Sequence, residues 1–219
     1  TCVYIAATQE WADCHLSLKD CKIKYDILSD AELAKTSLME TPQQVIGVFK
    51  KRPSTLPSAK DLQSQLCLAL DTIQDPGNMG TIMRLASWFG IDHIVCSPDC
   101  ADIYSPKVVQ ATMGALGKVS IGCTVLSQFI REQHKEIPVY GTFLDGKDIY
   151  QCELSANGII VMGNEGNGIS PEVAASINHR LYIPPFPLGS PTIESLNVGV
   201  ATAIVCAEFR RRQLSNFNS

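Results

Sequence analysis

The sequence contains few aromatic residues, few charged residues and no hydrophobic run long enough to cross a membrane. Aromatic residues make up 7% and charged residues 18% of the 219 positions, and 18 Lys and Arg are outnumbered by 22 Asp and Glu. No basic stretch followed by an apolar one marks a secretory signal peptide. The net charge of −4 argues against a protein that coats itself in nucleic acid, because phosphate binding needs clustered cations. The chain opens with Thr1 instead of Met, so we expect that an upstream segment precedes it.

The chain has enough apolar material for a folded core, together with a few local groups of cations. Hydrophobic residues make up 45% of the sequence, which argues against global disorder. The cations gather at Lys50-Lys51-Arg52 and at Arg210-Arg211-Arg212, with Lys107 and Lys118 apart from them. The charge therefore permits RNA binding through a patch but does not predict it.

Nine cysteines and four histidines raise the question of disulfides, metal binding or redox chemistry. The cysteine spacings do not repeat, and Cys96 and Cys100 have no second pair elsewhere to complete a metal site. Cys67 and Cys206 lie inside apolar runs. This pattern favours buried free thiols in a reducing cytoplasm over a metal or redox role. We therefore predict a cytoplasmic protein without a metal site.

Residues 1–50 have the pattern of a small α/β unit. Its expected strands are residues 2–6, 23–27 and 44–49. Ser29 can cap a helix, with Glu32 at the capping-box position. Two Pro, two Ser and several cations then predict a solvated linker over 51–62. The remaining residues, 63–219, form the second predicted domain.

The second domain alternates predicted strands with predicted helices. Residues 66–70 are continuously apolar, which is typical of a strand covered on both faces. Further strands are expected at 94–96, 139–144 and 158–162, with helices over 78–89, from 170 onward and over 196–212. This alternation predicts an α/β fold, with a parallel sheet and helices on both faces.

The first segment with candidate functional residues is the turn from Asp75 to Gly80, followed by Arg84. Asn78 lies near the expected helix start, and Gly80 can keep that start open for a ribose or phosphate near backbone N–H groups. Arg84 can reach a phosphate with a bidentate fork. The structural alternative is that Asn78 caps the helix, Gly80 packs and Arg84 is solvated. The segment alone does not decide between them.

The second segment runs from Met162 to Gly168 and reads Met-Gly-Asn-Glu-Gly-Asn-Gly after a buried strand. Its glycines allow positive φ angles and close approach of a flat ligand to the backbone. It lacks the Lys-Ser/Thr pair of a phosphate loop and the spacing of a dinucleotide fingerprint. A helix-capping turn leading into Ser170-Pro171 is the structural alternative.

The third segment, Glu194-Ser195-Leu196-Asn197, places a carboxylate, a hydroxyl and an amide just before an apolar helix. Ser195 can cap this helix, and Asn197 can satisfy backbone groups of its first turn. A helix that only packs has no need of an Asn there. The segment therefore points to a site at the helix start.

Together and in this order, the three segments resemble the three motifs of the SpoU (TrmH) family of RNA ribose 2′-O-methyltransferases, within the SPOUT superfamily. The resemblance extends over about residues 66–212 and includes the pair Ile183-Pro184. It implies a deep C-terminal trefoil knot, a homodimer, S-adenosylmethionine as cofactor and tRNA or rRNA as substrate. Residues 37–48 resemble the end of the small ribosomal-protein-like RNA-binding domain often fused ahead of this fold, which implies that residues 1–50 are part of such a domain.

The resemblance also implies roles for individual residues. It assigns Asn78 and Arg84 to the catalytic centre, where Arg84 would bind RNA phosphate and help remove the proton of the 2′-OH. The other catalytic residues that it implies are Glu165, Ser195 and Asn197. The cofactor-binding residues that it implies are Met162, Gly163, Gly168, Ile183 and Leu196.

Two departures from the family pattern bear on these roles. Residues 184–194 form a longer and more Pro-rich loop than is usual, which can reshape the cofactor pocket, and Gly199 stands where Ser is common. Because Arg is almost always protonated, Arg84 suits an orienting role better than that of a base, and the proton acceptor stays open. Two other functions also stay open: a non-catalytic RNA-binding or assembly protein with this fold, and an unrelated nucleotide-binding α/β domain.

Overall fold

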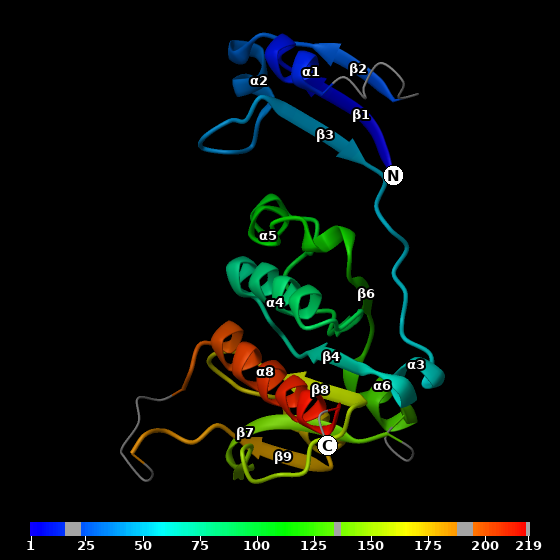
Figure 1. Ribbon diagram of the computed structural model, residues 1–219, viewed down its shortest axis with the longest axis vertical. Helices are drawn as coiled ribbons and strands as arrows, with labels where there is room; N and C mark the ends of the chain where they lie inside the picture. The colour runs from blue at the N-terminus through cyan, green and yellow to red at the C-terminus, as the bar shows by residue number, and fades with distance from the viewer. Residues whose placement is uncertain (16–22, 134–136, 188–194, 218–219) are drawn as a thin grey trace. The chain divides into compact units, whose positions relative to one another are not determined.

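The chain divides into two compact units, Thr1–Pro53 and Ser54–Ser219 (Figure 1). The computed structural model describes residues 1–15, 23–133, 137–187 and 195–217. Among these residues, no helix is long and apolar enough to cross a membrane.

The first unit is a mixed sheet with two helices in its described part. Its strands are β1 (Cys2–Ala7), β2 (Lys24–Ile27) and β3 (Val45–Phe49), and its helices are α1 (Gln9–Cys14) and α2 (Asp30–Thr36). The strand order is β2-β1-β3, with β2 parallel and β3 antiparallel to β1. Ser29 caps α2 in a capping box with Glu32, which confirms the sequence prediction.

The second unit is built on a parallel sheet. Its strands are β4 (Leu66–Leu70), β5 (His93–Cys96), β6 (Ser120–Cys123), β7 (Val139–Asp148), β8 (Gly158–Met162) and β9 (His179–Tyr182). Its helices are α3 (Ala59–Ser64), α4 (Pro76–Trp88), α5 (Pro106–Ala111), the 3-10 turn η2 (Ala115–Gly117), α6 (Leu126–Gln133), α7 (Pro171–Ala174) and α8 (Val198–Phe217). Over the described residues this sheet has six strands in the order β6-β5-β4-β8-β7-β9, and every pair is parallel. The predicted α/β class with a parallel sheet is confirmed.

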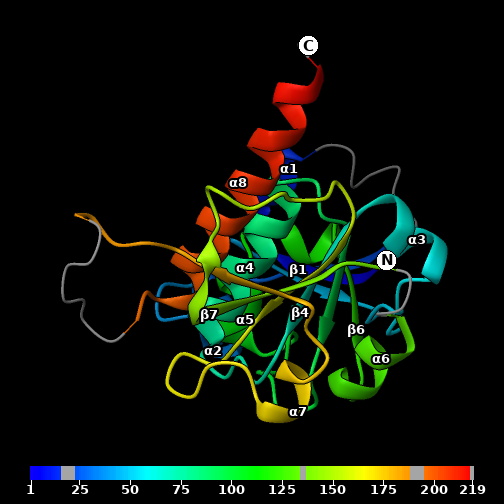
Figure 2. The ribbon, with the colours of Figure 1, turned by 90° about the horizontal axis from the view of Figure 1, so that it is seen from below.

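Strand β4 shows how the sheet is buried on both faces. Leu66, Leu68 and Leu70 pack in a core cluster with side chains of α4 and α8. Cys67 and Ala69, which alternate with them, pack in a second cluster with side chains of α3, α6 and α7. Figures 1 and 2 show α4 and α8 lying side by side against the sheet. Helices therefore cover both faces, and the continuous apolar run of β4 follows from that position.

Gly80 lies on the face of α4 that packs against the end of α5. A Cβ atom on Gly80 would lie 2.4 Å from the Cβ of Ala111 and 3.0 Å from the backbone N of Thr112. The space in front of Gly80 is therefore filled by α5. The expectation that Gly80 keeps the helix start open for a ribose or phosphate is wrong, and its packing alternative is correct.

The arginines near the end of α8 anchor that helix to its surroundings. Arg210 donates through Nε to the carbonyl oxygen of Phe89 (2.7 Å) and through Nη2 to that of Gly90 (2.8 Å). Arg212 donates to the carbonyl oxygen of Tyr150. This group of cations, which the sequence offered as part of an RNA-binding patch, thus has structural partners.

The segment expected to be a linker, residues 51–62, is structured over its second half. The N–H of Thr55 donates to the carbonyl oxygen of Ile121 (3.4 Å), and the N–H of Cys123 donates to Oγ of Ser54 (3.2 Å). Helix α3 then starts at Ala59. Ser54 and Thr55 therefore contact β6, and residues 54–62 belong to the second unit.

Candidate functional site

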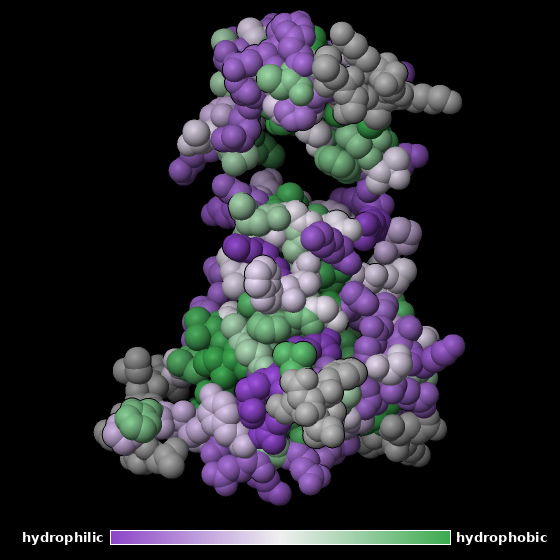
Figure 3. All heavy atoms as spheres, in the orientation of Figure 1, coloured by the Kyte–Doolittle hydropathy of each residue, from purple (hydrophilic) through white to green (hydrophobic). Residues whose placement is uncertain are grey.

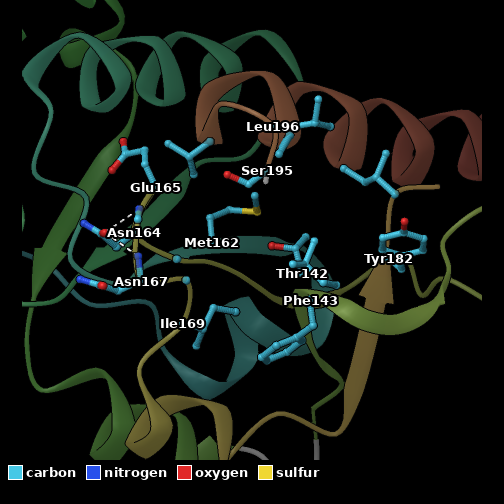
Figure 4. Close-up of a pocket in the computed structure, with 17 residues that line it drawn as sticks. Thr142, Phe143, Met162, Asn164, Glu165, Asn167, Ile169, Tyr182, Ser195 and Leu196 are labelled. Carbon is cyan, nitrogen blue, oxygen red and sulfur yellow. Dashed lines mark hydrogen bonds between the residues drawn. The ribbon is translucent and has the colours of Figure 1, made fainter. Parts of the chain in front are cut away.

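A cavity of about 720 Å³ opens where β7 and the segments after β8 and β9 meet the start of α8 (Figure 4). Its volume falls within the range of about 300–1,000 Å³ that is typical of small-molecule sites. Figure 4 shows Glu165 at one end, Tyr182 at the other and Met162 between them. The lining residues are Thr142, Phe143, Leu144, Met162, Gly163, Asn164, Glu165, Gly166, Asn167, Gly168, Ile169, Tyr182, Ile183, Ser195, Leu196, Val198 and Ala201.

The side chain of Asn164 shapes the glycine-rich loop after β8. Its Oδ1 accepts hydrogen bonds from the backbone N–H groups of Gly166 (2.9 Å) and Asn167 (3.0 Å), drawn as dashed lines in Figure 4. Its backbone N–H and C=O pair with those of Gly168, at 2.9 Å each. This arrangement closes residues 164–168 into a tight turn beside the cavity.

Two glycines make that turn possible. A Cβ atom on Gly163 would lie 2.3 Å from the carbonyl carbon of Gly168 and 2.4 Å from the N of Ile169, so no larger residue fits. Gly168 has a φ of 68°, which L side chains rarely adopt. The sequence prediction of a positive φ in this loop is confirmed at Gly168.

The loop after β8 is tied to the loop between β4 and α4. The Nδ2 of Asn164 donates to the carbonyl oxygen of Thr72 (2.8 Å), and the N–H of Ser170 donates to Oδ2 of the buried Asp71 (2.7 Å). Thr72 has a φ of 58°, unusual for a residue other than Gly. The loop just before the first motif is thus bonded to the second motif, although the two are far apart in the sequence.

Asn78 connects all three motifs. Asp75 caps α4, because its Oδ1 accepts from the N–H of Asn78 (2.7 Å), so the side chain of Asn78 is not the cap. Instead, its Nδ2 donates to Oε1 of Glu165 (2.6 Å), and its Oδ1 accepts from Nδ2 of Asn197 (3.0 Å). A carboxylate only accepts, so the contact with Glu165 fixes which way both amides point. The helix-cap alternative for Asn78 is wrong.

Asn197 also caps α8. Its Oδ1 accepts from the N–H groups of Gly199 (2.9 Å) and Val200 (3.2 Å), at the start of a helix that begins at Val198. Ser195 lies three residues before that start and lines the cavity. The alternative in which Ser195 caps the helix is therefore wrong, and the expected start at residue 196 was two residues early.

Arg84 lies outside the cavity lining, on an exposed position of α4. With the residues that the structure describes, its side chain makes no hydrogen bond or ion pair. An exposed guanidinium without a protein partner can bind an external anion such as a phosphate.

The structure brings together most of the residues that the sequence singled out. Seven of them line the cavity: Met162, Gly163, Glu165, Gly168, Ile183, Ser195 and Leu196. Asn78 and Asn197 do not line it but reach it through Glu165, and Arg84 remains apart. The Pro-rich loop falls partly on residues 188–194, which lie outside the described residues.

Sequence reasoning missed one wall of the cavity. Thr142, Phe143 and Leu144 on β7 and Tyr182 at the end of β9 line it. The register of β7 against β9 shifts between Thr142 and Lys147. No sequence pattern indicates a register shift between two strands. The sequence therefore held no signal for the cavity wall formed by β7 and β9.

The site is suited to a ligand with apolar and polar parts. Met162, Phe143, Ile183 and Leu196 offer apolar surface, whereas the tight turn offers backbone groups and Glu165 a carboxylate. Among the described residues, no group of three or more His, Cys, Asp or Glu side chains could hold a metal ion.

The sequence and the fold are both similar to those of known proteins. The model of the SpoU rRNA methylase family matches residues 65–207. The 23S rRNA (guanosine(2553)-2′-O)-methyltransferase RlmP of Bacillus subtilis is 31% identical over 186 residues, which cover 84% of this chain and 71% of RlmP.

Two solved structures resemble this one over nearly the whole chain. A protein of the TrmH family of RNA methyltransferases from Porphyromonas gingivalis is 39% identical, with a TM-score of 0.83 over 96% of this chain and 83% of its own. An AdoMet-bound rRNA methyltransferase from Sinorhizobium meliloti is 26% identical, with a TM-score of 0.79 over 96% of this chain and 80% of its own.

Proposed function

This chain belongs to the SpoU rRNA methylase family, and we propose that it transfers a methyl group from S-adenosylmethionine to a ribose 2′-OH of RNA. The chain is thus an S-adenosylmethionine-dependent RNA ribose 2′-O-methyltransferase. The observation that carries this function is the set of hydrogen bonds from Glu165 through Asn78 to Asn197, which joins three separate motifs beside one cavity.

The cavity fits the cofactor. The tight turn at 163–168 presents its backbone to the cavity, and apolar walls face it from Met162, Ile183 and Leu196. S-adenosylmethionine supplies an activated methyl group on a sulfonium, and the protein supplies position and electrostatics. We assign the cofactor to Met162, Gly163, Gly168, Ile183 and Leu196.

The remaining site residues orient the RNA. A ribose hydroxyl is a poor nucleophile, so the site must hold it in line with the methyl group and assist loss of its proton. Arg84 binds an RNA phosphate through its exposed guanidinium, and Ser195 contacts the ribose from the cavity wall. Glu165 fixes the amides of Asn78 and Asn197, which keeps the third motif in place against the first.

The variant Arg84→Ala tests this division of labour. We expect methyl transfer to RNA to fall by on the order of 100-fold or more, because the phosphate loses its anchor, while cofactor affinity stays unchanged. Titration calorimetry with S-adenosylmethionine and its demethylated product measures the affinity, and transfer of a labelled methyl group measures the reaction. Equal loss of cofactor binding would show that Arg84 belongs to the cofactor site.

A folded wild-type protein that binds neither form of the cofactor would instead support the non-catalytic RNA-binding alternative. Arg84→Lys serves as the matched variant, because it keeps the charge but loses the bidentate fork. We expect it to recover only part of the activity.

The family also supports proposals about assembly. We expect a homodimer through one face of α8, on which Val200 and Leu214 are 51% and 66% exposed. Figure 3 shows hydrophobic side chains gathered over the first turns of this helix. The mass of the protein in solution tests this proposal.

We also propose four finer features: a knot, a division into domains, a class of substrate and a compartment. The deep trefoil knot is supported by the family and by the return of the chain from β9, at the sheet edge, to α8 against α4. Residues 1–50 are proposed as part of an RNA-binding domain and 63–219 as the methyltransferase domain. The substrate is proposed as tRNA or rRNA, and the compartment as the cytoplasm.

A further inference from the structure

Strand β7 contains an irregular stretch at the edge of the cofactor cavity. Thr142 and Lys147 both pair in register with Leu181 of β9, so residues 143–146 are additional chain on the β7 side. The two backbones approach closely at the end of this stretch, where a Cβ atom on Gly146 would lie 2.4 Å from the carbonyl carbon of Leu181. We call residues 143–146 the β7 bulge. Bulges redirect side chains and are common beside active sites.

The first two residues of the β7 bulge, Phe143 and Leu144, form part of the cavity wall. A Cβ atom on Gly141 would lie 2.9 Å from Cε2 of Phe143 and 3.1 Å from Cδ1 of Ile169, so the Phe143 ring lies over this glycine. Figure 4 shows Phe143 and Ile169 on the same side of the cavity. The position of the Phe143 ring therefore determines the shape of this wall.

Arg180 of β9 holds the β7 bulge from outside the cavity. Its guanidinium carbon lies 3.5 Å from the centroid of the Phe143 ring, and its Nη2 donates to Oδ1 of Asp145. Arg180 is not one of the residues that line the cavity. One side chain thus contacts the first and the third residue of the bulge, and it acts on a bound ligand through the wall alone.

The ion pair between Arg180 and Asp145 lies at the surface, with side chains that are 42% and 75% exposed. The hydrogen bond from Arg180 lowers the pKa of the Asp145 carboxyl, so both groups are charged at neutral pH. Exposed ion pairs contribute little to stability, because water and salt screen them. We therefore expect Arg180 to affect the placement of Phe143 more than the stability of the fold.

We propose that Arg180 is a positioning residue for cofactor binding: its contacts with Phe143 and Asp145 hold the β7 bulge so that Phe143 forms a wall for the cofactor. A cation over an aromatic ring is attracted to the face of that ring, which favours one placement of the ring over others. A wall that is already in place does not have to be ordered when the ligand binds, and this strengthens binding. The inference rests on the proposed function, because it places S-adenosylmethionine in the cavity.

The first measurement concerns the Phe143 ring alone and does not depend on the proposed function. The full chain is labelled with para-fluorophenylalanine, and the fluorine resonance of Phe143 is assigned by its absence in Phe143→Leu. We expect Arg180→Ala to shift this resonance, because the cation leaves the ring. The control Lys147→Ala, which removes an exposed cation just after the bulge, should not shift it. An unchanged resonance in Arg180→Ala, or the same shift in both variants, overturns the proposal.

The second measurement is the affinity for the demethylated cofactor, determined by titration calorimetry. We expect Arg180→Ala to bind it on the order of fivefold more weakly than the wild type. Its melting temperature should stay within about 2 °C of the wild type, because the ion pair is exposed. Arg180→Lys keeps the charge but loses the planar group over the ring, so it should recover only part of the affinity. Wild-type affinity in Arg180→Ala, or an equal loss in Lys147→Ala, overturns the proposal.

A double-mutant cycle shows whether Arg180 acts through Phe143. Phe143→Leu keeps an apolar side chain but removes the ring, and we expect Arg180→Ala to cause little further loss of affinity in that background. Equal losses in both backgrounds overturn the proposed route through Phe143. A wild type that binds no cofactor overturns the proposed function instead, while the fluorine measurement still decides whether Arg180 holds the ring.

Discussion

At the scale of single residues, Asn197 uses the two ends of its amide for two purposes. Its oxygen caps α8, and its nitrogen donates to Asn78. A substitution that keeps the oxygen but removes the nitrogen therefore separates this structural role from the catalytic role that we propose for Asn197.

Asn197→Asp should keep the cap, because Asp is as good a capping residue as Asn, and lose the donor to Asn78. We expect stability to stay within about 0.5 kcal/mol and methyl transfer to fall on the order of 100-fold. Asn197→Ala should lose a similar factor in rate and also about 1 kcal/mol of stability. Chemical denaturation and labelled methyl transfer measure the two effects. Wild-type rates from the Asp variant would remove Asn197 from the catalytic site.

Gly163 allows a prediction about the cofactor loop. Gly163→Ala places a Cβ against the backbone of Gly168 and Ile169, so the turn has to shift. Overpacking of this kind costs about 1–3 kcal/mol, and we expect cofactor affinity to fall roughly 10- to 100-fold. In the matched variant Gly166→Ala, the new Cβ meets only Oδ1 of Asn164 at 3.6 Å. Calorimetric titration should find near wild-type affinity there, and equal losses in both variants would contradict the role of Gly163.

The sequence predicted site residues where unusual polar types or glycines stand at fixed offsets, as at Glu165 and Gly163. It could not predict Phe143 and Tyr182, because a strand residue that lines a cavity looks like any strand residue. Nor could it choose among the roles of Asn78, since the choice depends on Asp75 taking the cap and on partners from distant segments.

At the scale of elements, the end of α8 illustrates how a charge pattern misleads. Arg211 and Arg212 both pair with Glu208, whose side chain is only 5% exposed. These partners lower the pKa of Glu208, Arg211 first, against the effect of burial. The run of cations therefore serves the packing of one helix, and the sequence alone shows only that it is positive.

Glu208→Gln should destabilise the protein by about 1–3 kcal/mol near neutral pH, because the three hydrogen bonds from Arg211 and Arg212 to this buried group lose their charge assistance. Since the folded-state pKa of Glu208 is depressed, its contribution is present above its unfolded pKa and is lost as the pH falls through the folded value. The free energies of unfolding of the wild type and of Glu208→Gln should therefore converge as the pH falls below 4.5, the ordinary pKa of Glu. Thermal melts over a range of pH measure this difference, with Glu132→Gln, at an exposed position of α6, as the control. A constant difference at every pH would contradict it.

Long apolar runs made β4 and β8 predictable from the sequence. Strand β9 offered no such run, because two of its four residues are exposed. A short strand at a sheet edge forms because it pairs with the neighbouring strand. Its own residues therefore do not suffice to predict it.

At the scale of the whole molecule, the boundary between the units decides what can fold alone. We expect the fragment 54–219 to fold and to bind the cofactor as the full chain does, because it contains the entire cavity. A fragment starting at residue 63 lacks Leu62, which is fully buried in the core, and should be less stable by about 2–5 kcal/mol. Thermal melts and calorimetric titration compare the two. Equal stability of the fragments would place the boundary where the sequence pattern put it.

The sequence placed that boundary at residue 62 because Pro, Ser and cations look the same in a free linker and in a segment laid along a strand. What distinguishes them is Gly122: the side chain of Leu56 and the carbonyl of Thr55 occupy the space that a Cβ there would need. Only the folded sheet contains that information.

The hydrogen bonds of the Asn78 amide limit which substitutions can accumulate in this protein during evolution. One carboxylate orients two amides, and the last of them starts a helix, so a substitution at Glu165, Asn78 or Asn197 alters the surroundings of the other two. Variation at one position is therefore tolerated only with compensating variation at the others. We therefore expect these three positions to vary together among related sequences, although they lie far apart in the chain.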